Sequence, residues 1–469
     1  MMDLLLEAWV SGLAEYSKVK WMMGAGERWR PGRKLRLLLA GYNGTRNTGS
    51  DLRVEEIVRQ VKRILGPENV ALSVMSQNFE NSKGYFEDAR QLHLPDVYPP
   101  FLFREAWAHD GVVACEGSMF KSKFANALTT MMIGALGIAA AQNKLSVGFG
   151  GDADEMDATL ARMCRRYCRD SLIITRSKGS QEALGKIGVH SELGTDTAWT
   201  FEPRAPEYGE KTLRDAGWDG RAKVMVLCPI NPFWWPVNAS LWKWFAHATA
   251  GTYKKTYYRT IYFHRGGRAV DEAYEKYLNA FARAADRYKR ERGAFVIVVG
   301  MERLDREACA RLGEKLGGAP VFTSERYDMY ELVSILRRCD RMVSSRYHAI
   351  VTSMPAGVPS AGVTMDERIR GLMLERGHAH LMLKVNEADL DEKIFTVMEA
   401  LDREADSVRC AIQKTVVNHL RTMARMGVLF EERVARTYPE FPIRSGRLSW
   451  EDYIPPLSPP LRRLMESCG

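Results

Sequence analysis

An arginine and a histidine two positions apart, Arg346 and His348, are the side chains whose types and spacing best suit anion and proton chemistry. A guanidinium holds a carboxylate or phosphate through two parallel hydrogen bonds, and an imidazole titrates near neutral pH. The pair follows the β-prone run 341–345 and precedes apolar residues at helical spacing and a second β-prone run, 359–363. This pattern predicts a βαβ unit. Because ligands of open α/β sheets bind beyond the carboxyl ends of the strands, the pair and the turn 364–367 should face one crevice; a purely structural histidine is the alternative.

A second cation stands at the end of another predicted strand, 171–175, where Arg176 is followed by Ser177 and Ser180. A fixed guanidinium beside small hydroxyl groups suits a phosphate or a carboxylate. A solvated surface turn has the same composition, so the residues alone leave both interpretations open.

A glycine-rich loop, 41–51, follows a buried strand predicted at 35–40 and precedes an amphipathic helix. Strand, glycine loop and helix are the opening of a nucleotide-type α/β domain. The glycine spacing is neither GxGxxG nor that of a P-loop, so neither nucleotide fingerprint is supported. Glycine permits close backbone approach, and a helix amino terminus offers N–H groups to an anion or a sugar hydroxyl. A tight turn without a ligand explains the loop equally well.

Alternating β-prone runs and helical patterns predict an α/β fold with two parallel sheets. The predicted strands are 35–40, 70–75, 111–115, 145–149 and 171–175 in the first series, and 224–228, 294–299, 320–323, 341–345 and 359–363 in the second. The Pro-, Gly- and charge-rich stretch 201–220 has the composition of a linker. We therefore expect an amino-terminal helix and linker at 1–34, domains at 35–200 and 221–405, and a helix with a Pro-rich tail at 406–469 that packs back on the first domain.

Composition narrows the class of partner. The chain has 469 residues, enough for more than one core. Its formal charge of +9 favours anionic partners, and a phosphorylated small substrate fits. The basic residues are spread through the chain without one dominant tract, which argues against nucleic acid. No Cys or His cluster has zinc spacing, so we expect reduced thiols and no metal site.

The amino terminus carries Asp3 and Glu7 inside an apolar stretch and lacks a basic segment, which argues against a signal peptide. The most apolar run, 131–141, is shorter than the ~20 residues of a membrane-spanning helix. We expect a cytoplasmic protein whose first helix docks on the protein itself or makes a peripheral contact with the inner face of a membrane.

An aromatic segment, Asn231-Pro232-Phe233-Trp234-Trp235-Pro236, follows the first strand of the second series. Its rings can stack on a sugar face or a lipid carrier. Packing on its own domain is the more ordinary use.

In their order along the chain, these motifs resemble the polysaccharide pyruvyl transferase family over roughly residues 35–375. The resemblance is carried by the loop 41–51, the Gly117-Ser118 turn, Arg176-x-x-x-Ser180, Asp196-x-Ala198, and Arg346-x-His348-Ala349 followed by Ala356-Gly357-Val358-Pro359. The sequence departs from the family pattern at two loops. Asn47-Thr48-Gly49-Ser50-Asp51 stands for Asn-x-Gly-Asp, and Ala114-Cys115-Glu116 replaces a run of glycines. These differences bear on the acceptor more than on the donor.

The resemblance implies two Rossmann-like domains whose sheets face each other across a cleft, in the GT-B arrangement of glycosyltransferases. It implies a transferase of cell-envelope polysaccharide biosynthesis. Such enzymes move the enolpyruvyl unit of phosphoenolpyruvate onto hydroxyls of a glycan or lipid-linked sugar, forming a pyruvyl ketal and releasing phosphate. Neither a cofactor nor a metal is implied.

Position and resemblance together assign roles to particular residues. His348 is expected to be the acid or base, and Arg176 to stabilise charge as a second catalytic residue. Arg346, Ser177 and Ser180 are expected to hold the donor. The other expected substrate-binding residues are Asn47, Gly49, Asp51, Gly117, Ser118 and Glu367, with Asp366 as the cap of the helix that Glu367 begins. This hypothesis requires the wall with Arg176 to face the wall with Arg346 and His348.

Two other functions are left open. A glycosyltransferase of the same architecture would hold the diphosphate of a nucleotide sugar at helix amino termini, with Glu367 near the ribose. A catalytically silent binding protein is suggested by the altered glycine loops, whereas the presence of both Arg176 and His348 argues against it.

Overall fold

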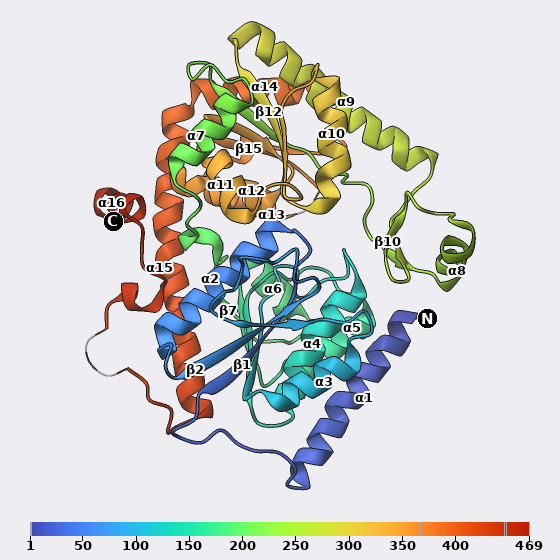
Figure 1. Ribbon diagram of the computed structural model, residues 1–469, viewed down its shortest axis with the longest axis vertical. Helices are drawn as coiled ribbons and strands as arrows, with labels where there is room; N and C mark the ends of the chain where they lie inside the picture. The colour runs from blue at the N-terminus through green and yellow to red at the C-terminus, as the bar shows by residue number, and fades with distance from the viewer. Residues whose placement is uncertain (1, 366, 445, 447, 469) are drawn as a thin grey trace.

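Two parallel β-sheets flanked by helices form the two halves of the molecule (Figure 1). The computed structural model describes residues 2–365, 367–444, 446 and 448–468. The α/β class and the two parallel sheets predicted from the sequence are confirmed.

The first sheet is built around a strand that is buried on both faces. Its strands are β1 (Leu35–Asn43), β2 (Val70–Ser76), β3 (Arg90–His93), β4 (Gly111–Ala114), β5 (Leu145–Gly151), β6 (Leu172–Thr175) and β7 (Glu192–Leu193), in the order β3-β2-β1-β4-β5-β6-β7. Along β1, Leu37 and Leu39 join one apolar cluster, whereas Leu38 and Ala40 join another. Because side chains alternate between faces, such an unbroken apolar run is what a central parallel strand requires.

The helices that cover this sheet divide between the same two clusters. Helix α2 (Thr48–Leu65) belongs to the cluster of Leu37 and Leu39, and α3 (Pro99–Ala108) and α4 (Asn126–Ala140) belong to that of Leu38. Helix α1 (Met2–Met22) packs on α3 and α4. The same half contains α5 (Ala158–Tyr167) and α6 (Lys178–Lys186).

The second sheet contains the βαβ unit predicted around His348. Its strands are β8 (Val224–Cys228), β12 (Phe295–Gly300), β13 (Val321–Thr323), β14 (Arg341–Ser344), β15 (Ser360–Thr364) and β16 (Met382–Lys384), in the order β13-β12-β8-β14-β15-β16. Helix α12 (Tyr347–Ser353) connects β14 to β15, which pair in parallel. The other helices of this half are α9 (Arg268–Arg292), α10 (Arg306–Lys315), α11 (Met329–Arg337), α13 (Glu367–Glu375) and α14 (Leu390–Arg403).

The stretch 201–220, predicted to be a linker, is instead partly helical. Helix α7 (Pro206–Asp215) begins with a proline, which suits the first helical position, and buries Leu213. It packs on α11 so closely that a Cβ on Gly209 would lie 2.5 Å from the carbonyl oxygen of Ser334. Pro206 therefore begins a helix, and Gly209 allows the close contact between α7 and α11.

A small antiparallel sheet, which was not predicted from the sequence, lies between β8 and α9 along the chain. It consists of β9 (Asn238–Ala239), β10 (Tyr257–Arg259) and β11 (Tyr262–Phe263) in the order β10-β11-β9. Helix α8 (Leu241–Ala250) connects β9 to β10 and projects from the edge of the molecule with the sheet (Figure 1).

A long helix, α15 (Ala405–Thr437), runs along both halves (Figure 1). It contacts α14 of the second half and α2 and β5 of the first. The amide of Gln60 in α2 donates a hydrogen bond of 2.9 Å to the carbonyl of Met423 in α15. The chain ends with α16 (Pro459–Cys468). In the described part of the chain, no helix combines the length and apolar character needed to cross a membrane.

Candidate active site

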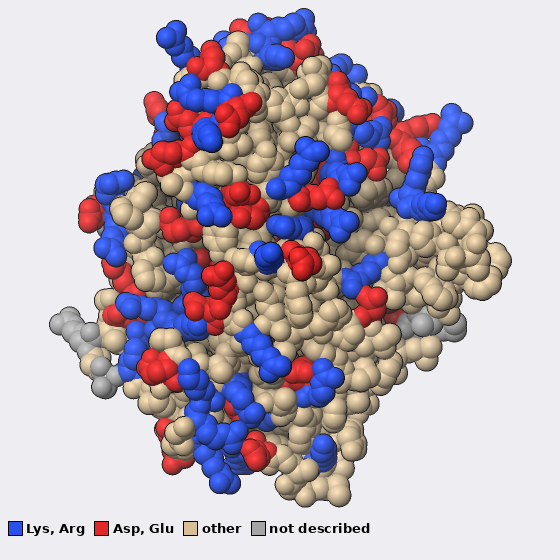
Figure 2. Space-filling view, viewed as in Figure 1, with Lys and Arg blue, Asp and Glu red and all other residues tan. Residues whose placement is uncertain are grey.

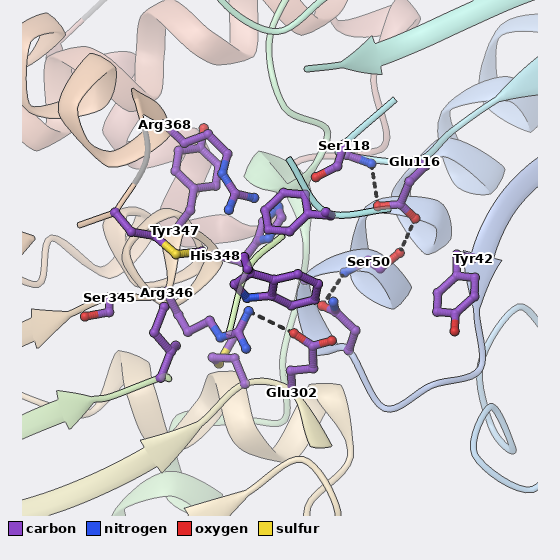
Figure 3. A pocket seen from close by; sticks show the side chains of 18 of the residues that line it. Tyr42, Ser50, Glu116, Ser118, Glu302, Ser345, Arg346, Tyr347, His348 and Arg368 are labelled. Carbon is purple, nitrogen blue, oxygen red and sulfur yellow. Dashed lines mark hydrogen bonds and ion pairs between the residues drawn. The ribbon is translucent and has the colours of Figure 1, made fainter. Parts of the chain in front are cut away.

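A cavity of about 120 Å³ lies between the two halves, beside the residues that follow β1, β4, β14 and β15 (Figure 3). These are carboxyl ends of parallel strands, where ligands of such sheets bind. The two halves meet here directly, because the amide of Thr48 at the start of α2 donates to the carbonyl of Met301 at 2.9 Å. Six of the predicted site residues line the cavity: Asn47, Gly49, Gly117, Ser118, Arg346 and His348.

A buried carboxylate, Asp196, joins the two walls of the site. Its oxygens lie 3.1 Å from Nε of Arg53, 3.1 Å from Nη1 of Arg176 and 3.3 Å from Nε2 of His348. Burial alone would raise the pKa of Asp196, but Arg53, His348 and Arg176 together hold that pKa well below its usual range. The walls bearing Arg176 and His348 therefore face each other through one ionised carboxylate.

His348 is held as a neutral imidazole with a defined tautomer. Burial lowers its pKa to about 4; Asp196 acts against this shift, and the charge of Arg176 adds to it. Because Nε2 faces a carboxylate, the ring proton belongs on Nε2, which leaves the lone pair on Nδ1. A Cβ on Gly49 would lie 2.1 Å from Nδ1, so glycine at the start of α2 is what allows this approach.

The pH dependence of stability should carry the signature of this imidazole. A histidine with an ordinary pKa of 6.5 in the unfolded chain binds a proton that His348, with a pKa of about 4, excludes in the folded chain. The unfolded state therefore gains protons first, and folded-state stability falls as the pH drops from about 6.5 to 4. Compared with a non-titrating His348→Gln variant, the wild type should lose about 2 kcal/mol more between pH 7 and pH 5. Urea denaturation measures both losses, and equal losses would contradict a neutral buried imidazole.

Arg346 lines the cavity but is already engaged by two carboxylates. Its Nε donates to Asp305 at 2.8 Å, and its Nη1 lies 2.8 Å from Glu302 (Figure 3). Glu302 lines the cavity with it. Asp305 therefore orients the guanidinium, while Glu302 is its partner on the cavity side.

Arg176 lies just behind the cavity wall. A Cβ on Gly117, which lines the cavity, would stand 3.4 Å from Nη1 of Arg176. The two serines predicted beside it are used within the protein. Ser180 donates to Asp152 at 2.7 Å, and Ser177 caps α6 by accepting from the Ser180 amide at 3.2 Å. Asp152 also lies 3.2 Å from Nη2 of Arg176, so these hydroxyl groups help to fix the arginine from outside the cavity.

The loop before α2 is organised by its own polar side chains. Asn47 caps the helix by accepting from the Ser50 amide at 3.2 Å, and the Ser50 hydroxyl donates to Glu116 at 3.1 Å (Figure 3). Asp51 lies beneath the loop, where it accepts from the Gly44 amide at 3.1 Å, and burial raises its pKa to about 7. Asp51 thus supports the loop from below, and Glu116 is the carboxylate on the cavity side. Within the described residues, no group of three or more His, Cys, Asp or Glu is placed to hold a metal ion.

Two arginines of the cavity escaped the sequence reasoning. Arg368 of α13 lines the cavity, whereas the neighbouring Glu367 is exposed and pairs with Arg370 at 2.7 Å. Thr364 and Met365 of the predicted turn line the cavity, and within α13 it is the second residue, Arg368, that reaches it. Arg53 lies on the buried, mainly apolar side of α2. A charged residue at such a position was the signal that could have identified it as a site residue. The predicted cap Asp366 lies outside the described residues.

The two tryptophans of the aromatic segment after β8 lie in different surroundings. Trp235 lines the cavity and meets Phe124 edge-on, with ring centroids 4.9 Å apart. Trp234 instead stacks on His264 at 4.6 Å. Tyr258 of β10 also lines the cavity, so the small antiparallel sheet contributes to its rim.

The arrangement of two Rossmann-like domains around an interdomain site is similar to that of solved structures of known proteins. A putative UDP-N-acetylglucosamine 2-epimerase from Listeria monocytogenes has a similar structure, with a TM-score of 0.53 and 13% identity over 85% of this chain and 98% of that chain. The MnaA–UDP structure from S. aureus gives a TM-score of 0.50 and 10% identity over 88% of this chain and all (100%) of that chain. At these identities, the likeness establishes the fold alone. A search of curated proteins gave no match.

Sequence comparison supplies the more specific assignment. Residues 47–367, from the cap of α2 through the βαβ unit of His348, match the family polysaccharide pyruvyl transferase. The chain belongs to this family and is a transferase.

Proposed function

We propose that this protein transfers the enolpyruvyl group of phosphoenolpyruvate onto two hydroxyl groups of a saccharide, forming a pyruvyl ketal and releasing phosphate. The observation that carries the proposal is the cluster in which Asp196 binds both Arg176 and His348 beside an interdomain cavity. Family membership supports the reaction type.

Donor binding is assigned to the positive side of the cavity. Phosphoenolpyruvate carries a carboxylate and a phosphate, and Arg346 and Arg368 both line the cavity. The amino terminus of α2, at Gly49, adds a partial positive charge. Arg176 acts from behind Gly117, where it raises the local positive potential and holds Asp196 in place.

Proton transfer is assigned to His348. Burial keeps this imidazole neutral, but the negative charge of a bound donor raises its pKa, so that it can carry a proton. It gives that proton to the methylene carbon of the donor, and a sugar oxygen bonds to the adjacent carbon. His348 then recovers a proton from the attacking hydroxyl. When the second hydroxyl attacks and the phosphate–carbon bond breaks, its proton leaves with phosphate, so the reaction needs no other reactant.

Acceptor binding is assigned to Glu116, Ser118 and Trp235, which also line the cavity. A carboxylate and a hydroxyl are suited to hydrogen bonds with sugar hydroxyls, and an indole can pack on a sugar face. Glu116 occupies a position at which the family pattern has glycine, so we expect it to contribute to the choice of acceptor.

A comparison of donors tests this assignment against the glycosyltransferase alternative. Phosphoenolpyruvate should raise the melting temperature and UDP- and GDP-sugars should not. Arg368→Met should weaken phosphoenolpyruvate binding about 10- to 100-fold, because one charge-assisted contact is lost. Arg370→Met is the matched control, since that side chain is exposed and paired with Glu367. Stabilisation by nucleotide sugars alone would contradict the proposed donor.

A further inference from the structure

Two helices that are distant in the sequence leave large apolar side chains uncovered. In α8, Leu241, Trp242, Trp244 and Phe245 are all exposed, Trp242 by 72%, and no residue of the helix is buried. A helix of this composition normally buries one face. Its large apolar side chains therefore remain substantially exposed among the described residues.

Helix α1 shows the same feature along one stripe. Leu5, Trp9, Tyr16 and Val19 are exposed and recur at spacings of three, four and seven residues, which places them on one face. The opposite face, with Val10 and Ala14, is buried against the first domain. Helix α1 is thus anchored by one apolar face and presents a second to its surroundings.

The start of α1 lies at the same edge of the molecule as α8 and the small antiparallel sheet (Figure 1). They also touch, because the hydroxyl of Tyr262 in β11 donates to Asp3 in α1 at 2.5 Å. Figure 2 shows largely uncharged atoms over the side on which α8 projects. The two exposed surfaces therefore form one apolar face.

An apolar groove of about 380 Å³ connects this face to the candidate active site. Leu5, Leu6 and Trp9 of α1 line one side, and residues 258–262 of the small sheet line another. Tyr42, Phe124, Leu128 and Tyr258 line both this groove and the active-site cavity. A surface that bound this face would therefore lie at the open end of the groove, which leads to the active-site cavity.

We propose that the face formed by α8 and the exposed stripe of α1 docks on the surface of an anionic lipid bilayer. Trp242 and Trp244 are exposed on α8, and Lys254 and Lys255 are exposed in the turn that follows this helix. Indole rings favour the boundary between headgroups and acyl chains, and lysines beside them attract anionic headgroups. The formal charge of +9 complements such a surface. This inference does not depend on which reaction the cavity performs.

Co-sedimentation of the full chain with vesicles tests the docking without any substrate. The protein should bind vesicles of phosphatidylcholine with phosphatidylglycerol more tightly than vesicles of phosphatidylcholine alone, and its tryptophan emission should shift to shorter wavelength on binding. Trp242→Ser with Phe245→Ser should weaken binding at least about tenfold, because two apolar side chains no longer leave water. Leu5→Ser with Trp9→Ser should act in the same direction.

Leu374→Ser is the matched control. This side chain is 53% exposed, similar to Phe245 at 57%, but belongs to α13 and to neither docking element. Its binding should equal that of the wild type. Absence of wild-type binding to either vesicle, or equal binding by the α8 variant, would overturn the proposal. So would a wild-type dimer that the α8 changes convert to monomer without any vesicle binding, since the face would then join two copies of the chain.

Discussion

The His348→Ala variant is expected to lose turnover by about 10²- to 10⁴-fold while remaining folded, because it removes the only proton carrier assigned to the reaction. The loss should appear in kcat, since proton transfer to the methylene carbon occurs in the transition state. Donor binding should change little. Arg346 and Arg368 still line the cavity in this variant.

The structure indicates why the variant should fold. His348 borders an existing cavity, and Asp196 keeps its two arginine partners at 3.1 Å when the imidazole is removed. No buried charge loses its only partner. Phosphate release from phosphoenolpyruvate with a saccharide acceptor measures the activity, and circular dichroism with a melting curve measures the fold. His190→Ala is the control, because the His190 side chain is 88% exposed. Full activity of folded His348→Ala would remove this residue from the mechanism.

The central strands of both sheets could be predicted because they are unbroken apolar runs between turn signals, as β4 and β8 are. The edge strands could not. Strand β3 (Arg90–His93) is short and polar, and β16 (Met382–Lys384) carries no periodic signal over so few residues. Such strands form because a neighbouring strand offers free backbone groups, which is a tertiary effect. Helix α7 (Pro206–Asp215) was also not predicted, because its proline and glycine are residue types that linkers commonly contain.

The candidate site was predictable where it follows strand ends and unpredictable where it depends on distant partners. Asn47, Gly49, Arg346 and His348 follow strands, and all four line the cavity. The sequence does not reveal that Asp196 lies beside His348, because 152 positions separate them. The same limit applies to the serines. Ser177 and Ser180 stand beside Arg176 in the sequence, but Ser180 turns to Asp152 in the fold.

The Asp196→Ala variant is expected to lose about 3–5 kcal/mol of folding stability, because it leaves Arg53 and Arg176 buried without their shared carboxylate. Breaking one partner of a buried ionic cluster costs more than the cluster itself contributes, since the remaining charges cannot regain water. Arg53 keeps carbonyl acceptors at Cys115 and Gly150, and Arg176 keeps Asp152, which limits the loss. Urea denaturation gives the free energy of unfolding. Asp286→Ala, which removes a surface ion pair with Arg290, should change it little.

A double-mutant cycle separates charge compensation from simple loss of packing. If Asp196 stabilises the fold mainly by compensating Arg176, then Asp196→Ala should cost about 1–3 kcal/mol less in an Arg176→Met background than in the wild type. Equal cost in both backgrounds would contradict this account. Measuring the activity of Asp196→Asn provides an independent test. Asparagine keeps the size of the side chain but removes its charge, and its amide can form a hydrogen bond with Nε2 of His348 whether or not that nitrogen carries the proton. The tautomer with the lone pair on Nδ1 is then no longer enforced, so turnover should fall even where the Asn variant remains folded.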